Sequence, residues 1–244
     1  MKKSVKITLI AAASLLLLIS WPAYQFYSEI SKAKSEDPLV WEADIAALEK
    51  KTTGRFAPGE GVVFVGSSSI RLWNTLEQDM APIPVIQHGF GGAKIQDVVH
   101  YADRLITHYQ PRAVVVFVAT NDITPEAAKP PHVVLAAYQA LIEKIRRENA
   151  DLPVFYIAIT PSILRWSVWD VAQEANALIA QWSKTQRNLY VIDTGAALLN
   201  ADGEPDDSNY VIDGLHLSDA GYRIWTRLIK PPLLAELGLS TDNN

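Results

Sequence analysis

The stretch that decides the fold is Val62-Val63-Phe64-Val65-Gly66-Ser67-Ser68-Ser69-Ile70. Its first four residues are apolar and mostly β-branched, which predicts a short buried strand. The run breaks at Gly66, where a tight turn is expected, and three serines follow. Such a turn holds a hydroxyl at the rim of a sheet, where an imidazole oriented by a carboxylate can activate it.

Further apolar runs alternate with segments of helical periodicity, and this alternation predicts a parallel sheet. Two of the runs, residues 113–118 and 154–159, are continuously apolar, as is typical of central strands covered on both faces. Right-handed crossover connections place the helices on both faces, which gives a three-layer α/β/α sandwich. We expect strands at residues 62–65, 85–86, 113–118, 154–159 and 189–192, and helices at about residues 94–109, 132–149, 170–186 and 219–229.

Polar residues gather where the expected strands end. In open α/β sheets, ligands bind beyond the carboxyl ends of the strands, so these residues are expected to share one site. They are Gly66-Ser67-Ser68-Ser69, Gly89-Phe90-Gly91-Gly92, Ala119-Thr120-Asn121-Asp122 and Thr160-Pro161-Ser162.

A carboxylate and an imidazole lie close together further along the chain. His216 follows Asp213 by three residues, on a turn before the helix expected from residue 219. A histidine suits proton transfer from a serine hydroxyl, and a carboxylate can fix its tautomer. Taken alone, this pair is more often a loop histidine beside a capping aspartate.

These residues together resemble the SGNH, or GDSL-type, hydrolases, over about residues 60–230. The resemblance implies a flavodoxin-like, five-stranded parallel sheet, with the expected strand order 2-1-3-4-5. The four family blocks occur in family order, as Phe64-Val65-Gly66-Ser67-Ser68-Ser69, Gly89-Phe90-Gly91-Gly92, Thr120-Asn121-Asp122 and Asp213-Gly214-Leu215-His216.

The resemblance also implies the roles of the site residues. Ser68 corresponds to the nucleophile, His216 to the general base and Asp213 to the residue that orients the histidine. The backbone N–H groups of Ser68 and Gly92 and the side-chain amide of Asn121 correspond to the oxyanion hole. No cofactor and no metal is implied.

Two positions depart from the family pattern. Ser67 stands where the family has an aspartate before the nucleophile, and Ala119 stands where the third block begins with glycine. The first departure concerns the geometry of the turn, so Ser67 and Ser69 remain alternatives to Ser68. A further alternative is that the serines only cap the helix expected from Ile70.

The N-terminus predicts export. Lys2, Lys3 and Lys6 precede an apolar run over residues 7–24, which indicates either an uncleaved anchor or a cleaved signal peptide. An anchor places the rest of the chain outside the inner membrane of a bacterium, facing the periplasm, whereas cleavage leaves it periplasmic or secreted. We expect a signal anchor or signal peptide at 1–27, a stalk and lead-in helix at 28–60, the SGNH hydrolase domain at 61–235 and a tail at 236–244.

The charge, the cysteine content and one motif argue against several other functions. The formal charge of −5 is spread along the chain, which argues against a nucleic-acid partner. The chain has no cysteine, so thiol catalysis and cysteine-ligated zinc are excluded. A nucleotide-binding flavodoxin-like protein is disfavoured, because Lys94 stands where a dinucleotide loop has its third glycine.

The resemblance therefore implies a serine esterase. The chain offers no lid insertion for long lipids, so we expect short acyl esters, such as O-acetyl groups on envelope glycans. Trp166 and Trp169 follow the fourth strand and either line the substrate pocket or pack in the core. An acyltransferase and a catalytically silent envelope-binding module are the alternatives on the same fold.

Overall fold

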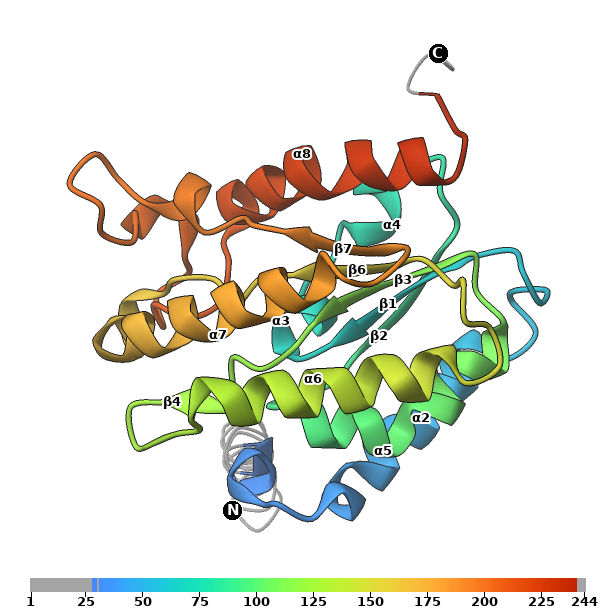
Figure 1. Cartoon of the computed structure of the whole chain (residues 1–244), viewed down its shortest axis with the longest axis horizontal. Helices are drawn as coiled ribbons and strands as arrows, with labels where there is room; N and C mark the ends of the chain where they lie inside the picture. The colour runs from blue at the N-terminus through green and yellow to red at the C-terminus, as the bar shows by residue number, and fades with distance from the viewer. Residues whose placement is uncertain (1–27, 30, 241–244) are drawn as a thin grey trace, which may run out of the picture.

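The computed structural model describes residues 28–29 and 31–240 (Figure 1). The apolar run that predicts an anchor or signal peptide lies outside these residues. Within the described ranges, no helix combines the length and the apolar character that crossing a membrane requires.

A five-stranded parallel sheet forms the middle layer of the molecule (Figure 1). Its spatial order is β2-β1-β3-β6-β7, which confirms the predicted order of the five main strands. A separate antiparallel hairpin pairs β4 with β5. The strands are β1 (Val62–Gly66), β2 (Val85–Gly89), β3 (Ala113–Phe117), β4 (Ile123–Thr124), β5 (Ala127–Ala128), β6 (Val154–Ile157) and β7 (Leu189–Ile192).

Helices cover both faces of the sheet, so the predicted three-layer sandwich is confirmed (Figure 1). Successive side chains of β1 point to opposite faces, with Val63 and Val65 in one core cluster and Val62 and Phe64 in the other. The first face carries α2 (Glu42–Thr52), α5 (Ile95–Leu105), α6 (Pro131–Arg146) and α7 (Trp169–Ser183), and the second carries α3 (Ser68–Arg71), α4 (Leu76–Asp79) and α8 (Asp219–Glu236). Short 3-10 helices are η1 (Pro38–Trp41), η2 (Thr107–Tyr109), η3 (Ile163–Val168), η4 (Ala196–Leu198) and η5 (Asp207–Asn209).

The last helix is longer than the sequence predicts. The sequence predicts a helix over about residues 219–229. Pro231 and Pro232 follow, and neither supplies a backbone N–H for a helical hydrogen bond. Helix α8 instead continues through both prolines to Glu236. Leu233 and Leu234 are buried against the second face, and this packing offsets the hydrogen bonds that the prolines omit.

Gly66 ends β1 at a point where no other residue fits. Its φ is +151°, and a Cβ built on it would lie 1.8 Å from the carbonyl oxygen of Phe117 on the neighbouring strand. We therefore expect Gly66→Ala to lower the free energy of unfolding by about 3 kcal/mol or more, because backbone must move to admit the methyl group. Urea unfolding followed by circular dichroism measures this change.

Gly203 is the matched control for that prediction. It has a φ of +81°, but no atom lies within 4 Å of a Cβ built on it. Gly203→Ala therefore keeps the conformational strain without the clash, and we expect a loss of only about 1–2 kcal/mol. Equal losses in the two variants would show that the close approach to Phe117 is not what requires glycine at position 66.

His88 on β2 is a fully buried histidine that does not belong to the candidate site. Its Nδ1 donates to the carbonyl oxygen of Leu105 at 2.6 Å, and its Nε2 lies 3.3 Å from the hydroxyl of Thr52. Burial lowers the pKa of His88 from 6.5 to about 4. The imidazole is therefore neutral in the folded protein at neutral pH.

This burial predicts an acid sensitivity. Below pH 6.5 the unfolded chain binds a proton that folded His88 accepts only near pH 4, so stability falls across this window as the pH falls. We expect His88 to remove about 2 kcal/mol between pH 7 and pH 5. Urea titrations at both pH values should show this loss in the wild type and a smaller loss in His88→Gln. An equal loss in the variant would assign the effect to other groups.

Candidate active site

The carboxyl edge of the sheet brings Ser68, His216 and Asp213 together. Ser68 is the first residue of α3, directly after the turn at Gly66. Its Oγ lies 2.8 Å from His216 Nε2, although the two residues are 148 positions apart in the sequence. His216 Nδ1 lies 2.6 Å from Asp213 Oδ2. The three side chains thus form a continuous line of hydrogen bonds.

The loop that carries Asp213 also orients its carboxylate. Oδ1 accepts the backbone N–H groups of Leu215 at 2.9 Å and His216 at 3.0 Å, which leaves Oδ2 to accept from the imidazole. Partial burial acts to raise the pKa of Asp213, but the bonds from the side chain and backbone of His216 and from Leu215 outweigh it and lower this pKa. An ionised Asp213 fixes the proton of His216 on Nδ1, so Nε2 is free to accept the hydroxyl proton of Ser68.

The other two serines are placed differently. Ser67 is buried, and its backbone N–H donates to the carbonyl oxygen of Phe117 at 3.0 Å. The carbonyl oxygen of Ser69 accepts from the hydroxyl of Tyr222 at 2.8 Å. Among the three hydroxyls, that of Ser68 lies within hydrogen-bond distance of His216.

The glycine loop after β2 is held close to two other segments. A Cβ on Gly91 would lie 2.6 Å from the ring of Trp41, and a Cβ on Gly92 would lie 2.3 Å from the Cβ of Ala33. Within the described ranges, the backbone N–H groups of Ser68 and Gly92 have no hydrogen-bond acceptor. Both are therefore free to donate to a ligand.

Residues 31–36, expected to be part of the stalk, lie against this same loop. Ala33 packs on Gly92, and the ammonium group of Lys94 donates to the carbonyl oxygen of Ser35 and to the carboxylate of Glu36, at 2.8 and 2.5 Å. This part of the chain thus contributes to the surroundings of the candidate site.

Asn121 lies in the loop that follows β3, beside the glycine loop. Its Nδ2 donates to the carbonyl oxygen of Ala93 at 3.0 Å, and its Oδ1 accepts from Arg165 Nη2 at 2.9 Å. Arg165 Nη1 donates to the carbonyl oxygen of Thr120. Burial lowers the pKa of Arg165 to about 10, so the guanidinium remains charged at neutral pH.

The sequence analysis did not single out Arg165. It lies in the segment of η3 whose apolar neighbours were considered as pocket residues. A lone arginine among Leu164 and Trp166, just after a strand end, was the available signal.

A narrow recess opens beside Ser68. Its volume for solvent is about 10 Å³, roughly enough for one water molecule. The hydroxyls of Thr120 and Ser162 are buried there and have no hydrogen-bond partner among the described residues. The recess is lined by Ser67, Ser68, Ser69, Phe117, Thr120, Asn121, Thr160, Ser162 and Leu215.

The two tryptophans considered as pocket residues do not line this recess. Trp166 and Trp169 stack on each other instead, with ring centroids 6.2 Å apart and an interplanar angle of 18°. Trp169 also packs against the core of the first face. This arrangement corresponds to the packing alternative.

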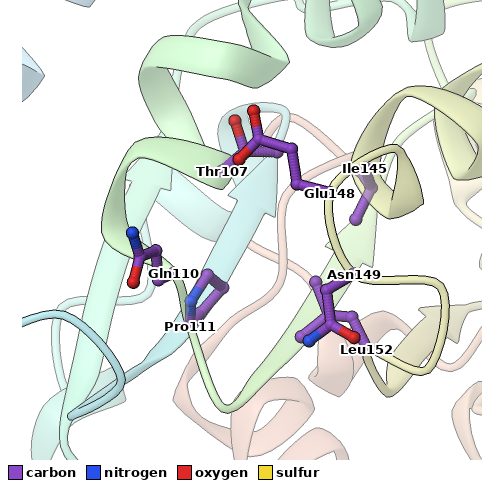
Figure 2. Close-up of a pocket in the computed structure, with 7 residues that line it drawn as sticks. All are labelled: Thr107, Gln110, Pro111, Ile145, Glu148, Asn149 and Leu152. Atoms are coloured by element: carbon purple, nitrogen blue, oxygen red, sulfur yellow. The ribbon is translucent and has the colours of Figure 1, made fainter.

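A second cavity lies at the opposite edge of the sheet, near the amino ends of β3 and β6 (Figure 2). Its volume is about 330 Å³, and Glu148 is the one ionisable side chain that lines it. No histidine or serine lines it, so this cavity holds no counterpart of the hydrogen-bonded Ser68, His216 and Asp213. Over the described ranges, no group of three or more His, Asp or Glu residues could hold a metal ion.

Comparisons with known proteins identify the family and the fold. The GDSL-like lipase/acylhydrolase family model matches residues 56–224. A protein from Streptococcus pneumonia, provisionally assigned as a platelet activating factor, has a TM-score of 0.70 at 17% identity, covering 91% of this chain and 99% of its own. A GDSL-like lipase from Bacteroides thetaiotaomicron has 0.64 at 20%, covering 82% and 98%. An acetyl xylan esterase from Geobacillus stearothermophilus has 0.56 at 17%, covering 78% and 100%.

At these identities the structural likeness shows the fold alone. No curated protein matches the chain. The family model covers most of the chain, and it confirms the resemblance on which the sequence analysis relied.

Proposed function

Because the chain belongs to the GDSL-like lipase/acylhydrolase family, we propose that it is a serine esterase that cleaves carboxylic esters with short acyl groups. The observation that carries this proposal is the line of hydrogen bonds from Asp213 through His216 to Ser68. A nucleophile, a base and an orienting carboxylate in this order are what hydrolysis through an acyl-enzyme requires.

The reaction follows from this geometry. Ser68 Oγ attacks the carbonyl carbon of the ester while His216 Nε2 takes the hydroxyl proton. The backbone N–H groups of Ser68 and Gly92 and one N–H of the Asn121 amide hold the negative oxygen of the tetrahedral intermediate. The intermediate breaks down, and His216 returns the proton to the departing alcohol. Water then attacks the acyl-Ser68 ester through the same base and releases the acid.

The narrow recess supports a short acyl group. A space for about one water molecule beside Ser68 suits an acetyl methyl group better than an extended chain. One of the structural neighbours is an acetyl xylan esterase, which is consistent with an acetyl ester as substrate. We therefore favour O-acetyl groups, such as those on envelope glycans.

We also propose that the protein works in the bacterial cell envelope. The support is the sequence of the first 24 residues, in which lysines precede an apolar run. An uncleaved run attaches the protein to the inner membrane with its catalytic domain in the periplasm. Mass spectrometry of the mature N-terminus distinguishes this arrangement from a cleaved, soluble form.

Hydrolysis of a p-nitrophenyl ester series by the full chain in detergent tests the proposed activity. We expect turnover of the acetate to exceed that of the butyrate and the octanoate. Product analysis with an acetylated glycan separates release of acetate from transfer to a sugar hydroxyl. A chain that binds glycans but turns over no ester would instead support the silent binding module.

A further inference from the structure

A side-chain amide stabilises an oxyanion only when its nitrogen faces the substrate, because its oxygen repels the same negative charge. The two ends of the Asn121 amide have nearly the same shape, so packing alone does not choose between them. Nδ2 donates one N–H to the carbonyl oxygen of Ala93 at 3.0 Å and keeps a second N–H for a ligand.

Arg165 supplies the second contact that sets the orientation of this amide, on the oxygen side. Its Nη2 donates to Asn121 Oδ1 at 2.9 Å, and its Nη1 donates to the carbonyl oxygen of Thr120. A guanidinium has donors only, so it can hydrogen-bond to an amide oxygen but not to an amide nitrogen. With the carbonyl of Ala93 on the other side, Asn121 is held between an acceptor and a donor.

The charge of Arg165 is as informative as its hydrogen bonds. Among the described residues Arg165 forms no ion pair. The negative charge of Asp122 acts to raise the pKa of Arg165, but the salt bridge of Asp122 is with Lys129, at 2.9 Å. A partly buried guanidinium that forms no ion pair among the described residues costs stability, and its hydrogen bonds to Thr120 and Asn121 direct it to the candidate site.

The loop of Arg165 is also tied to the loop of the catalytic histidine. The backbone N–H of Leu164 donates to the carbonyl oxygen of Gly214 at 2.9 Å, between Asp213 and His216 in the sequence. This hydrogen bond fixes the position of the Arg165 segment relative to the loop that carries Asp213 and His216.

We propose that Arg165 is a positioning residue of the oxyanion hole, which fixes the Asn121 amide with its nitrogen toward the substrate. This inference rests on the proposed esterase function.

Steady-state kinetics of the full chain test the proposal through a double-variant cycle. We expect Arg165→Gln to lower kcat about 10–100-fold and to change KM by less than about threefold. Asn121→Ala removes the donor itself and should lower kcat about 10²–10³-fold. Because Arg165 acts through Asn121, the double variant should lie within about threefold of Asn121→Ala. Arg165→Lys should recover only part of the activity, since one ammonium does not replace the paired donors.

Chemical rescue distinguishes this role from a purely structural one, which added guanidinium would not restore. Millimolar guanidinium chloride should raise the kcat of Arg165→Ala about fivefold or more, whereas sodium chloride at equal ionic strength should not. Arg187→Ala is the matched control, because that side chain is 83% exposed, and it should keep the wild-type kcat. Unchanged kcat in Arg165→Gln, a change in KM alone, or multiplicative losses in the double variant would overturn the proposal.

A spectroscopic readout separates this proposal from the proposed function. The side-chain amide signals of Asn121, identified by their loss in Asn121→Ala, should shift in Arg165→Lys nitrogen–proton spectra. Unmoved signals would show that Arg165 does not hold the amide. If the wild type hydrolyses no ester, the esterase proposal fails, and the amide signals still decide whether Arg165 orients Asn121.

Discussion

Replacing Ser68 by alanine is expected to lower the kcat for ester hydrolysis at least about 10⁴-fold. The variant removes the Oγ that lies 2.8 Å from His216 Nε2, and with it the atom that forms the acyl-enzyme. Oxyanion donors remain, so a small residual rate over water is expected. Release of p-nitrophenol from p-nitrophenyl acetate by the full chain measures the loss, and active-site titration excludes wild-type contamination.

Ser67→Ala is the matched control for that variant. It removes the same oxygen from the neighbouring residue, whose hydroxyl does not contact His216. We expect it to keep kcat within about tenfold of the wild type, since it disturbs the turn but not the nucleophile. Full activity in Ser68→Ala, or a larger loss in Ser67→Ala, would move the nucleophile to another serine.

Asp213→Asn is expected to lower kcat about 10³–10⁴-fold with little change in stability. The amide keeps the shape of the carboxylate but can no longer stabilise the imidazolium. The amide can also donate a hydrogen bond to Nδ1 of His216, which moves the histidine proton to Nε2. A protonated Nε2 cannot accept the hydroxyl proton of Ser68. Steady-state kinetics near neutral pH measure the effect.

The control for this substitution is Asp202→Asn, which makes the same change on the exposed turn between Asn200 and Glu204. We expect it to keep wild-type kcat, because it lies outside the line of hydrogen bonds at the site. An Asp213→Asn variant with wild-type kcat would show that the carboxylate serves the loop rather than the reaction. The N–H groups of Leu215 and His216, which bond to Oδ1, make that the specific alternative.

The proposed role of Ser68 could be predicted from the sequence, whereas that of Arg165 required the structure. Ser68 belongs to a block whose neighbours in the sequence set its turn, so its position can be predicted locally. Arg165 acquires a role only through Asn121, which lies 44 positions away, and no local pattern indicates that contact.

The strands could be predicted because a strand covered on both faces must be apolar at nearly every position, and 113–117 and 154–157 are fully buried. The extent of α8 could not, because local propensity ends a helix at Pro231, whereas burial of Leu233 and Leu234 continues it. Tertiary packing thus overrode a local rule at one place, while at the strands the two agreed.

The sequence by itself determined the layers of the fold and the segments that meet at the carboxyl edge, because these follow from apolar periodicity and the handedness of crossovers. The order of the strands was implied by the family resemblance. The tertiary structure alone decided that Trp166 and Trp169 stack on each other and that a partly buried guanidinium holds Asn121. The contact between Arg165 and Asn121 joins residues 44 positions apart, and the stacking of the two tryptophans depends on how their segment packs against the core. Composition and spacing encode neither.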